Sequence, residues 1–227
     1  MSNPRIIFFF DIDNTLLDND RVTLDIHHKL EEFCGVAACK RYWEIFEQKR
    51  TKNGYADYLA ALQAYRLEEM HDPRILSLSL YLTDYPFANR LFPGSLDAID
   101  FANQNGRAVI LSDGDAVFQP RKTYRAGIFD AVDNRVLIYI HKEQELDRVE
   151  RLYPADHYIM IDDKLRILTA MKKIWGDRLT TVFVRQGHYA IAPGVEDQYP
   201  AADVSINHIG ELPNVSLDDL LLRNSIK

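Results

Sequence analysis

The sequence has little of what marks secreted, membrane or fibrous proteins. Its 227 residues include two cysteines, ten glycines and nine prolines, and no segment is repetitive or of low complexity. These features exclude a disulfide-rich scaffold and a repeat or collagen-like fold. The apolar run Ile6 to Phe10 is shorter than a signal-peptide core of roughly 7–15 residues, and no run approaches the ~20 apolar residues of a membrane span. We therefore expect a soluble, cytoplasmic protein that does not enter a membrane.

The two cysteines, Cys34 and Cys39, lie close together in sequence that predicts helix. This spacing suits neither a disulfide framework nor a zinc site, because we see no histidine partners nearby. We expect buried free thiols, which are typical of a reducing compartment.

A concentrated positive charge is also missing. The formal net charge is −7, the sequence pI is about 5.5, and the basic residues are scattered. A nucleic-acid surface needs clustered lysine and arginine, so we expect no nucleic-acid partner. A small anionic substrate remains compatible, because one site can be positive on an acidic protein.

What is present is the composition of a globular protein, 47% hydrophobic and 27% charged. The length favours one core of about 150 residues with an insertion. The run Ile6 to Phe10 predicts a strand buried on both faces, as in a parallel sheet. Further strands are predicted at Arg107–Ser112, Arg135–Ile140, His157–Asp162 and Thr180–Arg185, with a weaker candidate at Asp203–Ile206.

Amphipathic stretches of helical length lie between these strands, at Ser95–Asn105, Gln119–Ala126, Glu143–Leu152 and Leu165–Trp175. Ser95 is placed to cap its helix. Strict alternation of strand and helix predicts an α/β fold, a Rossmann-like parallel sheet with helices on both faces.

One region breaks this alternation. Between Arg21 and Leu91 no strand is predicted, and helices are expected at Leu24–Phe33, Arg41–Lys49, Tyr55–Met70 and Pro73–Leu82. We predict a Rossmann-like core formed by residues 1–17 and 92–227, and an inserted α-helical domain at residues 18–91.

Polar residues follow four of the predicted strands. In an open parallel sheet, ligands bind outside the carboxyl ends of the strands, so these residues should meet at one edge. They are Asp11 and Asp13, Ser112 and Asp113, Lys142, and Asp162 and Asp163.

Converging carboxylates repel one another unless a cation lies among them, and a site rich in oxygen ligands predicts Mg²⁺. A hydroxyl and a lysine opposite the cation would hold phosphate oxygens. Aspartate can also form a covalent phospho-intermediate. The arrangement therefore predicts Mg²⁺-dependent phosphoryl transfer.

These motifs resemble the haloacid dehalogenase superfamily. The likeness rests on an apolar strand followed by D-x-D-N-T, a strand followed by Ser112, and Lys142 placed twenty positions before Asp162-Asp163. It covers essentially the whole chain, since the helical insertion lies where the superfamily's first type of cap is placed.

The resemblance implies a role for each matching residue. Asp11 would be the nucleophile, and Asp13 the general acid and then the general base. The metal would be held by the Asp11 side chain, the Asp13 backbone carbonyl and Asp163, with Asp162 supporting it from the next shell. The transferring phosphoryl group would be bound by Ser112, the backbone at Asp113 and Gly114, and Lys142.

Asp13 separates activities within the superfamily. The dehalogenases that this fold resembles lack the second aspartate, because a departing halide needs no proton, whereas the leaving alkoxide of a phosphate ester does. We therefore predict a phosphatase that hydrolyses a small phosphomonoester. Thr15 is expected to orient the aspartate pair, and Asn14 to fix the following turn.

Other interpretations stay open. The same site could serve a phosphotransferase or mutase on a sugar phosphate, or a regulatory protein that holds a phosphorylated ligand; a dehalogenase is the least favoured. The D-x-D motif alone also fits a turn with Asx hydrogen bonds, and Asp162-Asp163 fits a helix cap. The oligomeric state is not predicted.

Several neighbouring residues are interpreted as structural. We expect His141 to pack or to be hydrogen bonded rather than to act in catalysis. We expect Gly187 to serve backbone geometry, and Asp115, Arg121 and Lys122 to lie on a solvated face. The aromatic residues of the insertion are expected in its core; these are Tyr42, Trp43, Phe46, Tyr55, Tyr58 and Tyr65. Candidate specificity residues in the insertion are Arg50, Lys52, Tyr55 and Arg90.

Overall fold

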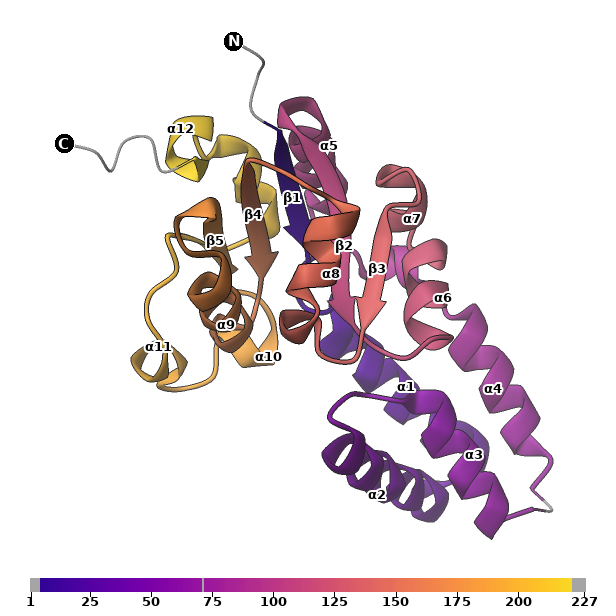
Figure 1. The fold of residues 1–227 in the computed structure, drawn as a ribbon. Coiled ribbons are helices and arrows are strands. Elements are labelled where there is room, and N and C mark those ends of the chain that lie inside the picture. The colour runs from indigo at the N-terminus through magenta and orange to yellow at the C-terminus, as the bar shows by residue number, and fades with distance from the viewer. Residues whose placement is uncertain (1–4, 71, 222–227) are drawn as a thin grey trace.

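A computed structural model describes residues 5–70 and 72–221. Its six strands form one sheet with the order β3-β2-β1-β4-β5-β6, and every neighbouring pair is parallel (Figure 1). The strands are β1 (Ile6–Phe10), β2 (Arg107–Asp113), β3 (Val136–Tyr139), β4 (His157–Asp162), β5 (Leu179–Val184) and β6 (Val204–Ile206). The predicted α/β fold is confirmed, and the weaker candidate at the last strand is present as β6.

The apolar run at the start of the chain forms the central strand. β1 lies between β2 and β4, and all five of its residues are buried. Successive side chains point to opposite faces of a strand, so both faces need cover. Phe8 and Phe10 belong to one buried cluster with Ile99, while Phe9 belongs to a second with Met171. The sheet is therefore covered by helices on both faces.

The core helices fill the gaps between strands. They are α5 (Ser95–Asn105), α6 (Phe118–Arg125), α7 (Ile128–Ala131), α8 (Leu146–Leu152), α9 (Leu165–Trp175), α10 (Gly187–Ala190), α11 (Val195–Gln198) and α12 (Leu217–Leu220). The 3₁₀ helices are η2 (Lys142–Gln144), η3 (Gly176–Arg178) and η4 (Ile209–Asn214).

The expected capping role of Ser95 is wrong. Gly94 stands at the N-cap position of α5 in the left-handed region, and Ser95 already lies inside the helix. Its hydroxyl donates to the Leu16 carbonyl at 2.7 Å, so it ties α5 to the segment that follows β1.

The insertion after β1 is helical, as predicted. Its elements are α1 (Asn19–Cys34), α2 (Val36–Asn53), α3 (Tyr58–Glu68), α4 (Arg74–Asp84) and the 3₁₀ helix η1 (Phe87–Arg90). The first helix begins earlier than expected because Asp18 caps it by accepting from the Arg21 amide at 2.8 Å. Gly54 in the left-handed region ends α2 at the predicted break.

The insertion forms a cap beyond the arrowheads of the strands (Figure 1). Its aromatic side chains are mostly core, since Tyr42, Phe46, Tyr58 and Tyr65 are buried. The Tyr58 ring lies 4.8 Å from the ring of Phe118 on α6. Cap and core therefore share one continuous apolar cluster.

The two crossings between core and cap pair with each other. The Asp18 amide donates to the Arg90 carbonyl at 2.8 Å, and the Phe92 amide donates to the Leu16 carbonyl at 3.0 Å. The Arg90 side chain binds within the cap, because its Nε lies 2.7 Å from the Tyr85 hydroxyl and 2.9 Å from Asp25 Oδ2. Arg90 therefore stabilises the cap where it joins the core. The predicted domain boundaries, between residues 17 and 18 and between residues 91 and 92, stay a prediction.

Both cysteines are free and buried, as expected. The expectation that no histidine lies near the cysteines is wrong, however, because the pairing of α1 with α2 brings His27 and Glu31 of α1 next to Cys39 of α2. Their potential ligand atoms lie within 4.8 Å of one another, although the thiol itself donates to the His27 carbonyl. Within the described ranges, no helix is both long and apolar enough to cross a membrane.

Candidate active site

The predicted strand-end residues meet at one edge of the sheet. The Asp11 amide donates to the Ile161 carbonyl at 3.0 Å, which joins the ends of β1 and β4. Lys142 reaches this point from the end of β3, and its Nζ lies 2.6 Å from Asp11 Oδ1 and 2.7 Å from Asp162 Oδ2. It also donates to the Leu111 carbonyl at 3.1 Å. Three strands thus hold one buried ammonium between two carboxylates.

Ser112 and Asp113 extend this arrangement from β2. The Ser112 hydroxyl donates to Asp11 Oδ1 at 3.0 Å, and Asp113 Oδ1 accepts from the Lys142 amide at 2.7 Å. Burial raises the pKa of Asp113 to about 6, although Lys142 opposes that rise. Asp113 therefore fixes the turn that carries Lys142.

The charges of the site depend on one another. Burial alone would raise the pKa of Asp11, but Lys142 and Lys164 outweigh it and hold that pKa below its usual value. Burial would lower the pKa of Lys142, but Asp11 and Asp162 raise it above its ordinary value. Asp11 is thereby kept ionised, as a nucleophilic carboxylate must be.

A group of three carboxylates has the character of a cation site. Asp11, Asp162 and Asp163 offer oxygen atoms within 4.8 Å of one another, and all three residues are buried. Both carboxylate oxygens of Asp163 and Oδ2 of Asp11 are buried and accept no hydrogen bond within residues 5–70 and 72–221. Burial also raises the pKa of Asp163 well above its ordinary value. Unpaired buried oxygens are costly, so the donor set fits a divalent cation.

Lys164 is a charged residue of this site that the sequence analysis missed. It follows Asp163, and its ammonium lies 4.8 Å from the centre of the Tyr189 ring. Burial would lower its pKa, but Asp163, Asp11 and Asp162 raise it above its ordinary value. A second ammonium therefore moderates the negative charge of the carboxylate group.

Asp13 is held by helix α6. Lys122 Nζ lies 2.6 Å from Asp13 Oδ1, and Gln119 Nε2 lies 3.4 Å from Asp13 Oδ2. The expectation that Lys122 lies on a solvated face is wrong, since it is buried. The helical spacing could have indicated this burial. Lys122 lies four residues after Phe118 and four before Ala126, and both of these residues are buried.

The turn after Asp13 is fixed by Asn14. This residue has a φ of 62°, and its Oδ1 accepts from the amides of Asn19 and Asp20 at 3.0 and 3.2 Å. The predicted role of Asn14 is confirmed. The turn also leaves no room above it, because a Cβ added at Gly187 would lie 2.3 Å from Asn14 Cβ.

We expect Gly187→Ala to destabilise the protein by about 2–5 kcal/mol, since a left-handed backbone and steric overlap both oppose the methyl group. Gly187 has a φ of +70°. Gly194→Ala is the matched control, because Gly194 has a φ of +74° but its added Cβ would be 3.9 Å from the nearest atom, Asp197 Oδ2. The control should lose only about 1–2 kcal/mol. Equal losses in urea unfolding would contradict the overlap with Asn14.

Thr15 and His141 are two further residues that the sequence singles out. The Thr15 hydroxyl is buried and makes no hydrogen bond among the described residues, so its orienting role stays a prediction. His141 packs against the cap, because a Cβ added at Gly54 would lie 2.8 Å from its Cε1. This position agrees with the expected packing of His141, and its having no part in catalysis stays a prediction.

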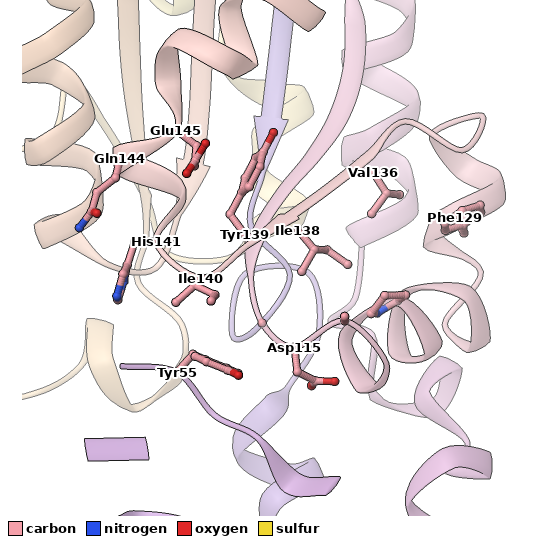
Figure 2. Close-up of a pocket in the computed structure, with 13 residues that line it drawn as sticks. Tyr55, Asp115, Phe129, Val136, Ile138, Tyr139, Ile140, His141, Gln144 and Glu145 are labelled. Carbon is pink, nitrogen blue, oxygen red and sulfur yellow. The ribbon is translucent and has the colours of Figure 1, made fainter. Parts of the chain in front are cut away.

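A cavity of about 850 Å³ lies along β3, the edge strand of the sheet, with Tyr55 of the cap on one side of it (Figure 2). Tyr55 of the cap and His141 of the core both line it, and Ile138 and Val136 form part of its apolar wall. Gly114, next to Asp113, is also among its lining residues. This volume is typical of small-molecule sites.

Comparison with known proteins agrees with this geometry. The sequence profile described as haloacid dehalogenase-like hydrolase matches residues 7–174. A protein from Burkholderia xenovorans LB400 assigned to these hydrolases is 56% identical, with a TM-score of 0.89 over 94% of this chain and 100% of that one. No curated protein matches the chain closely enough to count as a relative.

More distant structures share the fold. L-2-haloacid dehalogenase from Xanthobacter autotrophicus is 16% identical, with a TM-score of 0.60 over 92% of this chain and 96% of that one. A HAD-hydrolase from Bacillus subtilis, YfnB, bound to magnesium, is also 16% identical, with a TM-score of 0.60 over 93% of this chain and 98% of that one. The profile spans most of the chain, and the chain therefore belongs to the haloacid dehalogenase-like hydrolases.

Proposed function

We propose that this protein is a Mg²⁺-dependent phosphatase that hydrolyses a small phosphomonoester through a phosphoryl group carried on Asp11. The observation that carries the proposal is Asp13, a second carboxylate two residues after Asp11, held by Lys122 at 2.6 Å and still 25% exposed. A leaving alkoxide needs a proton donor at this position, whereas a leaving halide does not.

In the first step a carboxylate oxygen of Asp11 attacks phosphorus. The bond from phosphorus to the leaving oxygen breaks, and Asp13 donates its proton to that oxygen. In the second step Asp13 takes a proton from water as the water oxygen attacks phosphorus, and the bond from phosphorus to the Asp11 oxygen breaks. Inorganic phosphate then leaves, Asp11 is again a carboxylate, and Asp13 again carries its proton.

Ser112, the backbone at Asp113 and Gly114, and Lys142 would bind the oxygens of the phosphoryl group. Lys142 suits this role because it already lies 2.6 Å from the attacking carboxylate. Its fixed charge would stabilise negative charge that develops on the transferring group.

Asp11, Asp163 and the Asp13 carbonyl would hold Mg²⁺, with Asp162 supporting them from the next shell. The bound ion would supply positive charge that shields phosphate oxygens from the attacking carboxylate. Carboxylate and carbonyl oxygens are the ligands that Mg²⁺ prefers. The magnesium in the B. subtilis relative is consistent with this assignment.

We expect Asp163→Asn to stabilise the metal-free protein by roughly 1–3 kcal/mol at pH 8, because it removes a buried charge that accepts no hydrogen bond from the described residues. Mg²⁺ should raise the melting temperature of the wild type but not that of the variant. Thermal unfolding in EDTA and in Mg²⁺ measures both effects. A variant that is stabilised by Mg²⁺ as strongly as the wild type would contradict the assignment of Asp163.

The pH dependence of this difference has a definite sign. Burial raises the folded-state pKa of Asp163, so the neutral form is favoured in the folded protein. The stability that this group contributes is present below its unfolded pKa and is lost as the pH rises through the folded pKa. In EDTA, the advantage of Asp163→Asn should therefore shrink as the pH falls.

The activity is tested by measuring phosphate release from a broad panel of phosphomonoesters and halide release from 2-haloacids with one preparation. We expect phosphate release that requires Mg²⁺ and falls by about 10²–10⁴-fold in Asp13→Asn. Halide release without metal, with no phosphate release, would overturn the proposal. The two free thiols favour the cytoplasm.

A further inference from the structure

We propose that Lys122, assisted by Gln119, is a positioning residue that sets Asp13 for proton transfer to the leaving oxygen. This inference rests on the proposed phosphatase function, because it gives Lys122 a role in the step that only an ester requires. It extends the active site to a helix that carries none of the motif residues.

Both contacts come from one face of α6. Gln119 and Lys122 are three positions apart, so they are neighbours on the helix surface. Lys122 Nζ lies 2.6 Å from Asp13 Oδ1, and Gln119 Nε2 lies 3.4 Å from Asp13 Oδ2 and 3.2 Å from the Ser112 hydroxyl. The two oxygens of Asp13 are thus approached separately, which fixes the orientation of the carboxylate plane.

The ammonium lies behind Asp13 and does not face the substrate. The Lys122 side chain is 1% exposed, whereas the Asp13 side chain is 25% exposed. Lys122 also donates to Asn19 Oδ1 at 2.9 Å, where the first helix of the cap begins. Lys122 can therefore act on the reaction only through the carboxylate that it holds.

Helix α6 is itself held firmly. The Arg121 side chain donates to the Thr83 carbonyl at 2.9 Å and pairs with Asp84 at 2.8 Å, both at the end of α4 in the cap. One turn earlier on the helix, Phe118 packs against Tyr58 and Phe87, which also belong to the cap. A side chain anchored on such a helix can hold a partner within the narrow limits that proton transfer requires.

The test compares substrates that differ in their need for a proton. Acetyl phosphate releases a carboxylate, which needs none, whereas an alkyl phosphomonoester releases an alkoxide, which does. We expect Lys122→Met to lower kcat/KM for the alkyl ester found with the panel above by about 10²-fold. The same variant should keep kcat/KM for acetyl phosphate within a few-fold of the wild-type value, because this parameter reports only the steps up to the formation of the phosphoryl-enzyme.

Arg121→Met is the matched control, because it lies on the same helix and anchors α6 without touching Asp13. It should change the rates for the two substrates by the same factor. In the Asp13→Asn background, adding Lys122→Met should leave the ratio of the two rates unchanged, since the residue through which Lys122 acts is already absent.

An equal loss of kcat/KM for both substrates in Lys122→Met would overturn the inference and leave the phosphatase proposal intact. A wild type that is folded and Mg²⁺-loaded but releases no phosphate would overturn both.

Thermal stability tests the contact between Lys122 and Asp13 without any turnover, because Asp13→Asn leaves the buried ammonium of Lys122 without its counter-charge. The double variant should therefore melt at a higher temperature than Asp13→Asn, and a lower one would contradict the coupling.

Discussion

Asp11→Asn should lower turnover of a phosphomonoester by at least about 10⁴-fold, because an amide cannot form the covalent intermediate. The fold should survive this change. The amide oxygen can still accept from Lys142 and Ser112, which both contact Asp11 Oδ1. Phosphate release is the measurement, and circular dichroism with thermal unfolding is the control for folding.

Asn89→Asp is the control for an exchange between amide and carboxylate, since Asn89 is an exposed residue of η1. It should leave turnover within a few-fold of the wild type. Near-normal turnover in a folded Asp11→Asn protein would refute the nucleophile, whatever the identity of the substrate.

Lys142→Met should both inactivate and destabilise the protein. Lys142 is 2% exposed and lies between Asp11 and Asp162, so its loss leaves two buried carboxylates without their ammonium. Removing one partner from a buried ion pair costs about 3–5 kcal/mol. We expect that loss in urea unfolding at neutral pH in EDTA, with part of it recovered when Mg²⁺ is added.

Lys29→Met is the matched control for this prediction. Lys29 pairs with Glu32 at 2.8 Å on the surface of α1. An exposed pair of this kind contributes about 0–1 kcal/mol. If the two variants lost equal stability, the buried charge of Lys142 would not be what holds the strand ends together.

Much of the fold follows from local patterns. The apolar run Ile6 to Phe10 predicts a strand covered on both faces, and it is the central strand of the sheet. The convergence of Asp11, Asp162 and Lys142 follows from topology alone, because parallel strands present their carboxyl ends at one edge. Motif and topology together therefore define the inner part of the site.

The rest depends on contacts between segments distant in the sequence. Lys122 is buried only because α6 packs against the cap and against Asp13, 109 residues earlier in the chain. Ser95 has the sequence context of a helix cap, but its hydroxyl donates to the carbonyl of Leu16, a residue far from it in the sequence. Likewise, Cys39 meets His27 only through the pairing of α1 with α2. Local periodicity carries no information on such pairings.

Similarity to known proteins establishes the fold and the superfamily of this chain. The reaction that it catalyses has to be inferred from the residues of the site. A dehalogenase and a magnesium-bound hydrolase have the same TM-score of 0.60 against this chain. Fold likeness at this level cannot distinguish a halide from an alkoxide as leaving group. Asp13 and its contacts with α6 are the features that favour the ester.

The most direct test of the central claim is to look for the phosphoryl group on Asp11. We would mix Mg²⁺-loaded Asp13→Asn with acetyl phosphate, quench in acid within seconds, and examine the peptide that contains Asp11 by mass spectrometry. The account predicts one added phosphoryl group on Asp11, which accumulates because the variant lacks the base for the second step. Phosphate release by the wild type with no phosphoryl group on Asp11 in either protein would contradict it.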